Sequence, residues 1–221
     1  MNSVDIRLYV LLDPAVVDRD LLSAVAAEAA RGGATLFQYR DKTGSRAEKE
    51  GTLRKIRAAL MRSDARLLVN DDVEMALLVG ADGVHLGQDD MAPAEARRRL
   101  GPGAIIGRTI KNEDHARAIA EEPVDYAFCG GVFPTVHKDN PDAPIGLDGL
   151  ARIGSLLRRT KPGLPVGAIA GIDETNAGAV IAAGADGIAV IGAVTRSADP
   201  QAAARRLRNV VDDALRLRTA D

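Results

Sequence analysis

The chain has 221 residues, of which 46% are hydrophobic and 27% charged, and these ordinary values argue against a disordered, collagenous or coiled-coil protein. The net charge is −2, which argues against a basic surface that would bind nucleic acid or acidic membranes. Aromatic residues make up only 3% and Trp is absent, which argues against a surface that stacks on nucleic-acid bases. Divided into eight strand–helix units, the chain would give each about 28 residues, the size expected for one eight-fold α/β barrel.

The single cysteine, Cys129, excludes an intramolecular disulfide and a cysteine-based zinc cluster. The first apolar run, residues 8–12, is too short for a secretory signal. Residues 177–194 are nearly free of charge, but Asp186-Gly187 marks a turn within them, so we read a helix and a strand there and not a membrane span. We therefore expect a cytoplasmic protein.

Short runs rich in Val, Ile and Leu alternate with stretches of helical periodicity. The expected strands are residues 8–12, 36–39, 67–69, 83–86, 105–107, 126–129, 166–170 and 188–191. The expected helices are residues 21–31, 47–61, 73–79, 94–100, 113–121, 147–159, 174–183 and 201–218. Strict alternation of strand and helix indicates a parallel sheet, and eight units in this length favour closure into a barrel. The sequence predicts an α/β fold, a single (βα)8 TIM barrel that forms one catalytic domain over residues 1–221.

Basic residues follow several of the expected strands. In a barrel of this kind the carboxyl ends of the strands carry the chemistry, so these side chains would share one rim. Arginine forks onto phosphate oxygens and lysine acts as a point charge, which makes a polyanion the direct interpretation. Solvated loop charge is the alternative for any single one of them. The set is Arg40, Lys42, Arg108, Lys111 and Lys138.

Asp71 and Asp90 follow two neighbouring expected strands and should face each other. Two carboxylates with room for water and substrate oxygens suit Mg²⁺. Helix capping by these aspartates, or by Asp72 and Asp89 beside them, is the competing interpretation.

Gly171 and Gly192 end the last two expected strands, each just before a helical segment. Exposed backbone N–H groups at a helix start bind phosphate, and the loops after the last two strands are a frequent phosphate site of this barrel. The alternative is that glycine only eases a sharp turn. We expect His85 to form a local hydrogen bond and Cys129 to be an inert core residue.

Taken in chain order, several of these segments form a pattern across nearly the whole chain. The set resembles the superfamily of thiamine phosphate synthases and thiazole tautomerases, and within it the synthases. Each motif alone is weak to moderate, whereas the ordered set is specific. The matching segments are residues 38–42, 70–71, 83–90, 107–109, 133–138, 168–172 and 187–191.

The resemblance implies a transferase of thiamine biosynthesis on an eight-fold barrel. It would join 4-amino-2-methyl-5-hydroxymethylpyrimidine diphosphate to a thiazole phosphate and release pyrophosphate, by a dissociative, Mg²⁺-assisted substitution. The implied partners are small phosphorylated substrates, not nucleic acid or membrane, and a homo-oligomer is left open. The pyrimidine diphosphate would be bound by Gln38, Tyr39, Arg40, Asp41, Lys42, Asn70, Thr109 and Lys138, of which Arg40, Lys42 and Lys138 would be catalytic; the thiazole phosphate by Thr135, Val136, His137, Gly171, Ile191 and Gly192; and Mg²⁺ by Asp71 and Asp90.

The chain departs from the family pattern mainly on the thiazole side. His137 stands where a second hydroxyl residue is usual, Ala170 where a glycine is usual, and Gly192 where a serine is usual. Thr109 replaces a serine and keeps the hydroxyl. Two alternatives remain. One is a tautomerase-like isomerase, which would need neither a metal nor residues that bind a diphosphate. The other is a non-catalytic binder of phosphorylated ligands.

Overall fold

A computed structural model describes residues 4–135 and 143–219, and in it eight parallel strands close into a barrel in chain order. Each strand pairs with the next, and β8 returns to β1 through the pair Tyr9 and Ala189. This arrangement confirms the predicted (βα)8 barrel. The strands are β1 (Leu8–Leu12), β2 (Leu36–Tyr39), β3 (Arg66–Asn70), β4 (Gly83–Leu86), β5 (Ile105–Ile110), β6 (Tyr126–Cys129), β7 (Val166–Ile169) and β8 (Gly187–Val190).

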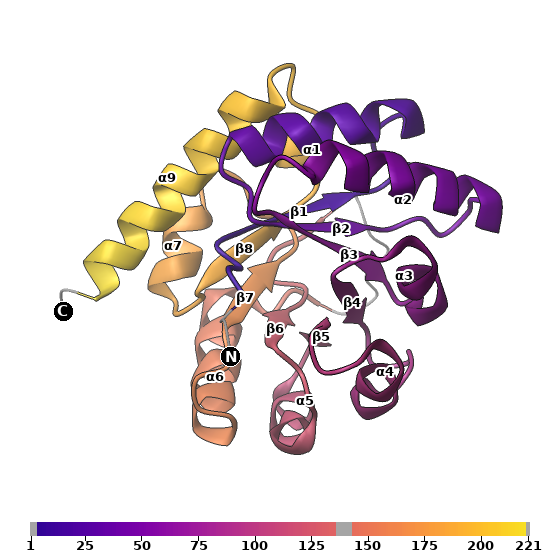
Figure 1. The fold of residues 1–221 in the computed structure, drawn as a ribbon. Helices are drawn as coiled ribbons and strands as arrows, with labels where there is room; N and C mark the ends of the chain where they lie inside the picture. Colours follow the sequence, from indigo (N-terminus) through magenta and orange to yellow (C-terminus); the bar gives the residue numbers. More distant parts are fainter. Residues whose placement is uncertain (1–3, 136–142, 220–221) are drawn as a thin grey trace.

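Helices surround the strands, with α1, α2 and α9 on one side of the barrel and α4, α5 and α6 on the opposite side (Figure 1). The long helix α9 packs against α1 and α7 and so closes the outer ring. The helices are α1 (Leu22–Arg31), α2 (Arg46–Leu60), α3 (Val73–Val79), α4 (Pro93–Leu100), α5 (Glu113–Ala118), α6 (Gly146–Thr160), α7 (Ala177–Ala182), α8 (Gly192–Thr195) and α9 (Pro200–Arg218), with 3₁₀ turns η1 (Arg19–Leu21) and η2 (Ile119–Glu121).

Most element boundaries fall within a few residues of the sequence predictions, with two informative differences. Strand β5 continues to Ile110, because Arg108 and Thr109 keep pairing with β6. The short helix α8 follows β8 directly and is too brief to leave a periodic pattern.

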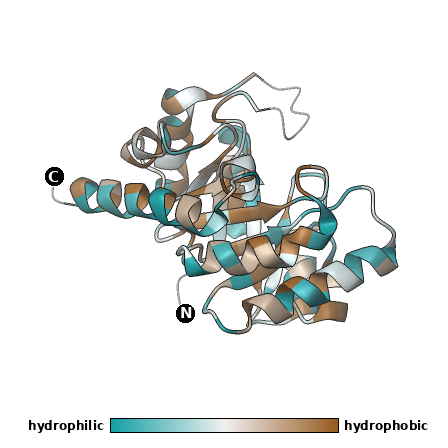
Figure 2. Ribbon diagram, turned by 90° about the horizontal axis from the view of Figure 1, so that it is seen from above, coloured by the Kyte–Doolittle hydropathy of each residue, from teal (hydrophilic) through white to brown (hydrophobic). Residues whose placement is uncertain are grey.

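The barrel interior is filled by side chains from alternate positions of the strands. Tyr9, Tyr126 and Phe128 are buried there with Leu11, Leu36, Leu68 and Ala189. Two glycines make the space for these rings: a Cβ on Gly107 would lie 2.1 Å from Cζ of Tyr126, and one on Gly167 would lie 2.3 Å from Cζ of Phe128. The other strand faces join the larger apolar layer under the helices. Hydrophilic and hydrophobic residues alternate along these helices (Figure 2).

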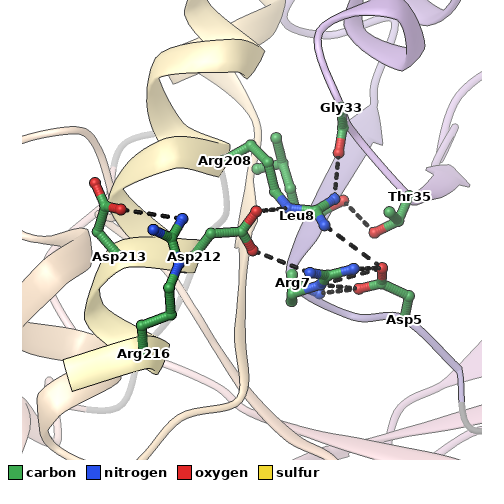
Figure 3. A network of polar contacts seen from close by, with 9 residues as sticks. All are labelled: Asp5, Arg7, Leu8, Gly33, Thr35, Arg208, Asp212, Asp213 and Arg216. Carbon is green, nitrogen blue, oxygen red and sulfur yellow. Dashed lines mark hydrogen bonds and ion pairs between the residues drawn. The ribbon is translucent and has the colours of Figure 1, made fainter. Parts of the chain in front are cut away.

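Polar side chains close the amino-terminal end of the barrel. Asp82, Asp125 and Asp186 stand just before β4, β6 and β8, and each accepts a backbone N–H of the preceding strand in the chain, at 2.7–2.9 Å. Arg7 donates to Asp5 and to Asp212 of α9, which ties the first strand to the last helix (Figure 3). This end therefore serves stability, and the opposite end carries the candidate site.

Candidate active site

The end of β2 aims two side chains at the barrel mouth. Leu36 and Gln38 face the interior, so by the alternation of strand residues Arg40 faces the same way. Gln38 is 3% exposed and donates from Nε2 to the Tyr9 hydroxyl over 2.6 Å. Arg40 donates to Asp13 over 2.5 Å, and this carboxylate follows β1 and is buried. The β2 end thus presents a fixed amide beside a fixed guanidinium.

Tyr39 and Asp41 do not share this direction, although the sequence grouped them with the pyrimidine-binding residues. The Tyr39 ring lies in the apolar layer under the helices, and its hydroxyl donates to Asp41 over 2.8 Å. Asp41 also accepts from Arg19 and from the backbone N–H groups of Thr43 and Gly44. Burial opposes ionisation of Asp41, but these hydrogen bonds outweigh it and hold its pKa well below the ordinary value. The pair therefore shapes the loop after β2 and is not aimed at the mouth.

The loop after β3 brings Asn70, Asp71 and Lys42 together. Asp71 accepts from Lys42 Nζ and from Asn70 Nδ2, each over 2.5 Å. Its backbone has φ 63°, a left-handed conformation that costs energy outside glycine. Its N–H is bound to the carbonyl of His85 on the neighbouring strand over 3.0 Å, which helps to hold this conformation.

Asp90 reaches the same place from the loop after β4. It accepts the N–H of Gly87 over 2.7 Å and shares a hydrogen bond with Asp71. Burial raises the pKa of the Asp90 carboxyl, and the neighbouring Asp71 raises it further. Burial also opposes ionisation of Asp71, but hydrogen bonds from Asp90 and Lys42 lower its pKa. A protonated Asp90 that donates to an ionised Asp71 accounts for the raised pKa of Asp90 and for the lowered pKa of Asp71.

This carboxylate pair has the donor chemistry that Mg²⁺ prefers. Two carboxylates this close can share a divalent cation in place of the proton. Water and phosphate oxygens would fill the remaining coordination positions of that cation. Among the described residues no group of three or more His, Cys, Asp or Glu side chains forms a metal site, so any metal at Asp71 and Asp90 would depend on further oxygen ligands. The residues present fit Mg²⁺ on those terms.

Strand β5 contributes Thr109 but turns Arg108 away. The Thr109 hydroxyl lies 2.9 Å from Nε2 of His85, so it faces the interior. Arg108 points outward and is buried, where it donates to the carbonyl of Gly87 and lies 3.3 Å from the Glu122 carboxylate. The expectation that Arg108 belongs to the cationic rim is therefore wrong, and its observed role is to hold the loop that carries Asp90.

The thiazole side is built by the loops after β6, β7 and β8. Gly171 has φ +65° and lies against the β6 loop: a Cβ there would be 2.5 Å from the carbonyl oxygen of Pro134, next to Thr135. Ile191 is the N-cap of α8, and Gly192 is its first residue, whose backbone N–H has no acceptor within the helix. Val136, His137 and Lys138 lie outside the described residues.

Sequence reasoning missed Asp13, Tyr9 and Tyr126. Asp13 directly follows the first strand, so the rule that gave Asp71 and Asp90 would also have found it. Tyr9 and Tyr126 lie within strands and carry no comparable signal. His85 forms hydrogen bonds, as expected, and Cys129 is buried with its pKa raised by burial to about 12, as befits an inert core thiol.

A hollow of about 660 Å³ lies at the opposite, amino-terminal end of the barrel. It is lined by Asp5, Arg7, Arg158 and Asp186, which already form ion pairs with one another. It shares no residue with the candidate site.

A family described as thiamine monophosphate synthase matches residues 8–194 of the chain. The chain belongs to this family. Membership makes the protein a transferase of thiamine biosynthesis and confirms the resemblance seen in the motifs. The thiamine monophosphate synthase match covers every described residue of the candidate site.

Curated relatives support the assignment over the whole length. A thiamine-phosphate synthase of Agrobacterium fabrum is 50% identical over 218 residues, 99% of each chain, and one of Chloroflexus aurantiacus is 43% identical over 208 residues, 94% of each. A solved thiamine phosphate pyrophosphorylase from Pyrococcus furiosus is 34% identical with a TM-score of 0.83 and covers 96% of this chain and 98% of its own. An orotidine 5′-phosphate decarboxylase from Pyrococcus horikoshii, at 13% identity and TM-score 0.67, shares the barrel fold alone. None of the described helices is long and apolar enough to cross a membrane.

Proposed function

We propose that the protein condenses 4-amino-2-methyl-5-hydroxymethylpyrimidine diphosphate with a thiazole phosphate, giving thiamine phosphate and pyrophosphate, in the cytoplasm. The observation that carries the proposal is the convergence of Arg40, Lys42 and the Asp71–Asp90 pair at one end of the barrel. Fixed cations beside paired carboxylates suit a diphosphate and its metal. Family membership supports the same reaction.

The first step breaks the bond between the pyrimidine methylene carbon and the diphosphate oxygen, and the electron pair leaves with the oxygen. Arg40 and Lys42 would stabilise the negative charge that develops on pyrophosphate, and Lys138 would join them by family resemblance. The Asp13 carboxylate holds Arg40 in position before the substrate arrives. Preorganised cations of this kind need not rearrange as the charge develops.

The amino group of the pyrimidine ring would stabilise the methylene cation, which the thiazole nitrogen then attacks to form the new carbon–nitrogen bond. Proximity and orientation supply most of the catalysis in such a step, and no general base is required. The thiazole phosphate would bind at Thr135, Val136 and His137 and at the backbone of Gly171, Ile191 and Gly192. The N–H of Phe133 donates to the carbonyl of Ala170 over 3.1 Å, which holds the loops after β6 and β7 together.

Asp71 and Asp90 would hold Mg²⁺, with Asn70 orienting Asp71 through its amide. When bound, Mg²⁺ would neutralise charge on the diphosphate. Lys42, which donates to Asp71 over 2.5 Å, stands beside the same carboxylate and would bind the phosphate oxygens of the diphosphate.

The test is to measure pyrophosphate release with each substrate alone and with both, in the presence of Mg²⁺ or a chelator. The proposal expects release with both substrates and loss of release with the chelator. Conversion of the thiazole phosphate alone, unaffected by the chelator, would instead indicate an isomerase. Thermal stabilisation by the substrates without turnover would indicate a binder.

The metal assignment has its own test. The Asp71→Ala, Asp90→Ala double variant should lose both turnover and the calorimetric signal of Mg²⁺ binding. The matched control is Asp89→Ala, an acidic residue of the same loop that is not assigned to the metal. Robust turnover by the double variant would refute the metal assignment.

A further inference from the structure

The loop after β2 is closed by one buried carboxylate. The Asp41 side chain is 1% exposed, and its two oxygens have different partners. Oδ1 accepts the backbone N–H groups of Thr43 and Gly44 over 3.0 and 2.8 Å. An aspartate that accepts the N–H groups two and three residues further on closes a tight turn. Lys42 lies inside this turn, so Asp41 fixes the backbone from which the Lys42 side chain extends.

The other oxygen ties this turn to the loop after β1. Oδ2 of Asp41 accepts from Nη1 of Arg19 over 2.5 Å and from the Tyr39 hydroxyl over 2.8 Å. The same Nη1 also donates to the Tyr39 hydroxyl, over 2.8 Å. Arginine can only donate hydrogen bonds, so the Tyr39 proton is left for Asp41 and each of the three groups has its partners. Arg19 thus holds the turn from the neighbouring loop.

Arg19 itself stands on a fixed segment. It begins η1, whose N-cap Asp18 accepts the N–H of Asp20 over 3.0 Å. The guanidinium passes close to Gly44: an added Cβ there would lie 2.8 Å from Nη2 of Arg19 and 2.4 Å from Oδ2 of Asp41. Glycine at this position therefore leaves the room that the ion pair occupies, and the turn fits closely against the loop after β1.

The Asp41 carboxylate would compete for Lys42 if it were not already occupied. Lys42 directly follows Asp41, yet its Nζ donates to Asp71 over 2.5 Å. An ionised carboxylate has about four acceptor positions. On Asp41 these are used, within the part of the chain that the structure describes, by the guanidinium, the tyrosine hydroxyl and the two backbone N–H groups. Because the Lys42 side chain is 56% exposed, packing does little to place it, and its direction depends on this turn.

We propose that Arg19 is a positioning residue that acts through Asp41 on Lys42, and so holds one of the cations that receive the diphosphate at the barrel mouth. This inference rests on the proposed function for the identity of the substrate. Arg19 would act without touching the diphosphate, which separates its role from that of Lys42. The loop after β1 would then fix both cations that follow β2, Arg40 through Asp13 and Lys42 through Arg19.

The kinetic test removes the guanidinium in Arg19→Met, which keeps a long unbranched side chain. We expect kcat/KM for the pyrimidine diphosphate to fall by about tenfold, because one of its contacts is misplaced, while KM for the thiazole phosphate stays as in the unmodified protein. Arg19→Lys keeps the charge and should recover part of the loss. The matched control is Arg54→Met, which removes an arginine that pairs with Glu50 within α2 and should change neither value.

A double-mutant cycle separates positioning from direct contact with the substrate. In a Lys42→Met background, Arg19→Met should cost less than about twofold in kcat/KM, because the side chain that Arg19 positions is already gone. The same tenfold loss in both backgrounds would show that Arg19 does not act through Lys42 and would overturn the proposal. A rise in KM for the thiazole phosphate equal to the loss on the diphosphate side would also overturn it, since that result indicates general damage to the barrel mouth.

A second measurement needs no turnover: titration calorimetry of inorganic pyrophosphate into the protein with Mg²⁺ present. We expect the Kd for pyrophosphate to rise by about tenfold in Arg19→Met and to stay unchanged in Arg54→Met. Weaker binding in Arg19→Met, with no thiamine phosphate formed by the unmodified protein, would refute the proposed function and leave the positioning role established. Unchanged binding in Arg19→Met, in a protein that does form thiamine phosphate, would overturn the positioning role and leave the proposed function intact.

Discussion

The Arg40 guanidinium is held at the barrel mouth by Asp13, with 2.5 Å between Nη1 and Oδ2 and only 2% of the Asp13 side chain exposed. The two residues follow β1 and β2, which lie side by side in the sheet. Asp13 also accepts the N–H of Ala15 over 2.8 Å, so its own position is fixed by its loop. This pair makes Arg40 a preformed anion contact, not a mobile surface charge.

We expect Asp13→Asn to lower kcat/KM for the pyrimidine diphosphate by roughly 10- to 100-fold, the worth of one charge-assisted hydrogen bond. Asparagine keeps an oxygen for the N–H of Ala15 and so spares the loop. In an Arg40→Met background the same change should cost much less, because the ion pair is already absent. Equal losses in both backgrounds would show that Asp13 does not act through Arg40.

Ala170 is expected to be a strained position. It has φ 90°, in the left-handed half of backbone space that glycine tolerates and alanine does not, and the family usually has glycine there. We expect Ala170→Gly to raise the free energy of unfolding by about 0.5–1 kcal/mol. This is the net of two effects: the folded state loses its backbone strain, and the unfolded chain gains conformational entropy from the glycine. Urea unfolding measures this. The matched control Ala168→Gly, in the buried part of β7, should destabilise, and an equal loss in both variants would refute the strain.

Gly107 should not tolerate a side chain, because its Cβ would occupy the space of the Tyr126 ring. We expect Gly107→Ala to destabilise by about 1–3 kcal/mol or more through overpacking. Gly103→Ala is the control, since nothing lies within 4 Å of a Cβ at that position. Similar unfolding midpoints for the two variants would contradict the packing described for the barrel interior.

The base of the barrel should lose stability in acid through Asp5. Burial opposes ionisation of Asp5, but hydrogen bonds and charge from Arg7, with the charge of Arg208, outweigh it and lower its pKa. A carboxyl whose pKa is lower in the folded state stabilises it above the unfolded pKa, and this contribution is lost as the pH falls through the folded pKa.

We therefore expect Asp5→Asn to destabilise at neutral pH by less than about 1 kcal/mol, because the pair is partly exposed, and this difference to vanish in strong acid. Asp213→Asn is the control: Asp213 pairs with Arg216 on the exposed side of α9, and its removal should have no measurable effect. A difference for Asp5→Asn that persists in acid would contradict the ion-pair explanation.

The sequence predicted the barrel and much of its mouth because two signals are local. Apolar runs mark buried strands, and the polar residues just after them must lie at one rim. The side of the strand to which each side chain points was harder to predict, because strands buried on both faces show no alternation of apolar and polar residues. Tyr39 and Arg108 were therefore grouped with neighbours that face the opposite way. The link from Arg19 through Asp41 to Lys42 joins the loops after two strands, a relationship that exists only once the sheet has formed.

The measurement that tests the account most directly is the balance of products from one incubation with both substrates and Mg²⁺. We expect thiamine phosphate and pyrophosphate to appear in equal amounts and together, with neither formed when one substrate is omitted. Pyrophosphate released without thiamine phosphate, or a changed thiazole phosphate with no pyrophosphate, would contradict the assignment of this barrel mouth to the joining of two substrates.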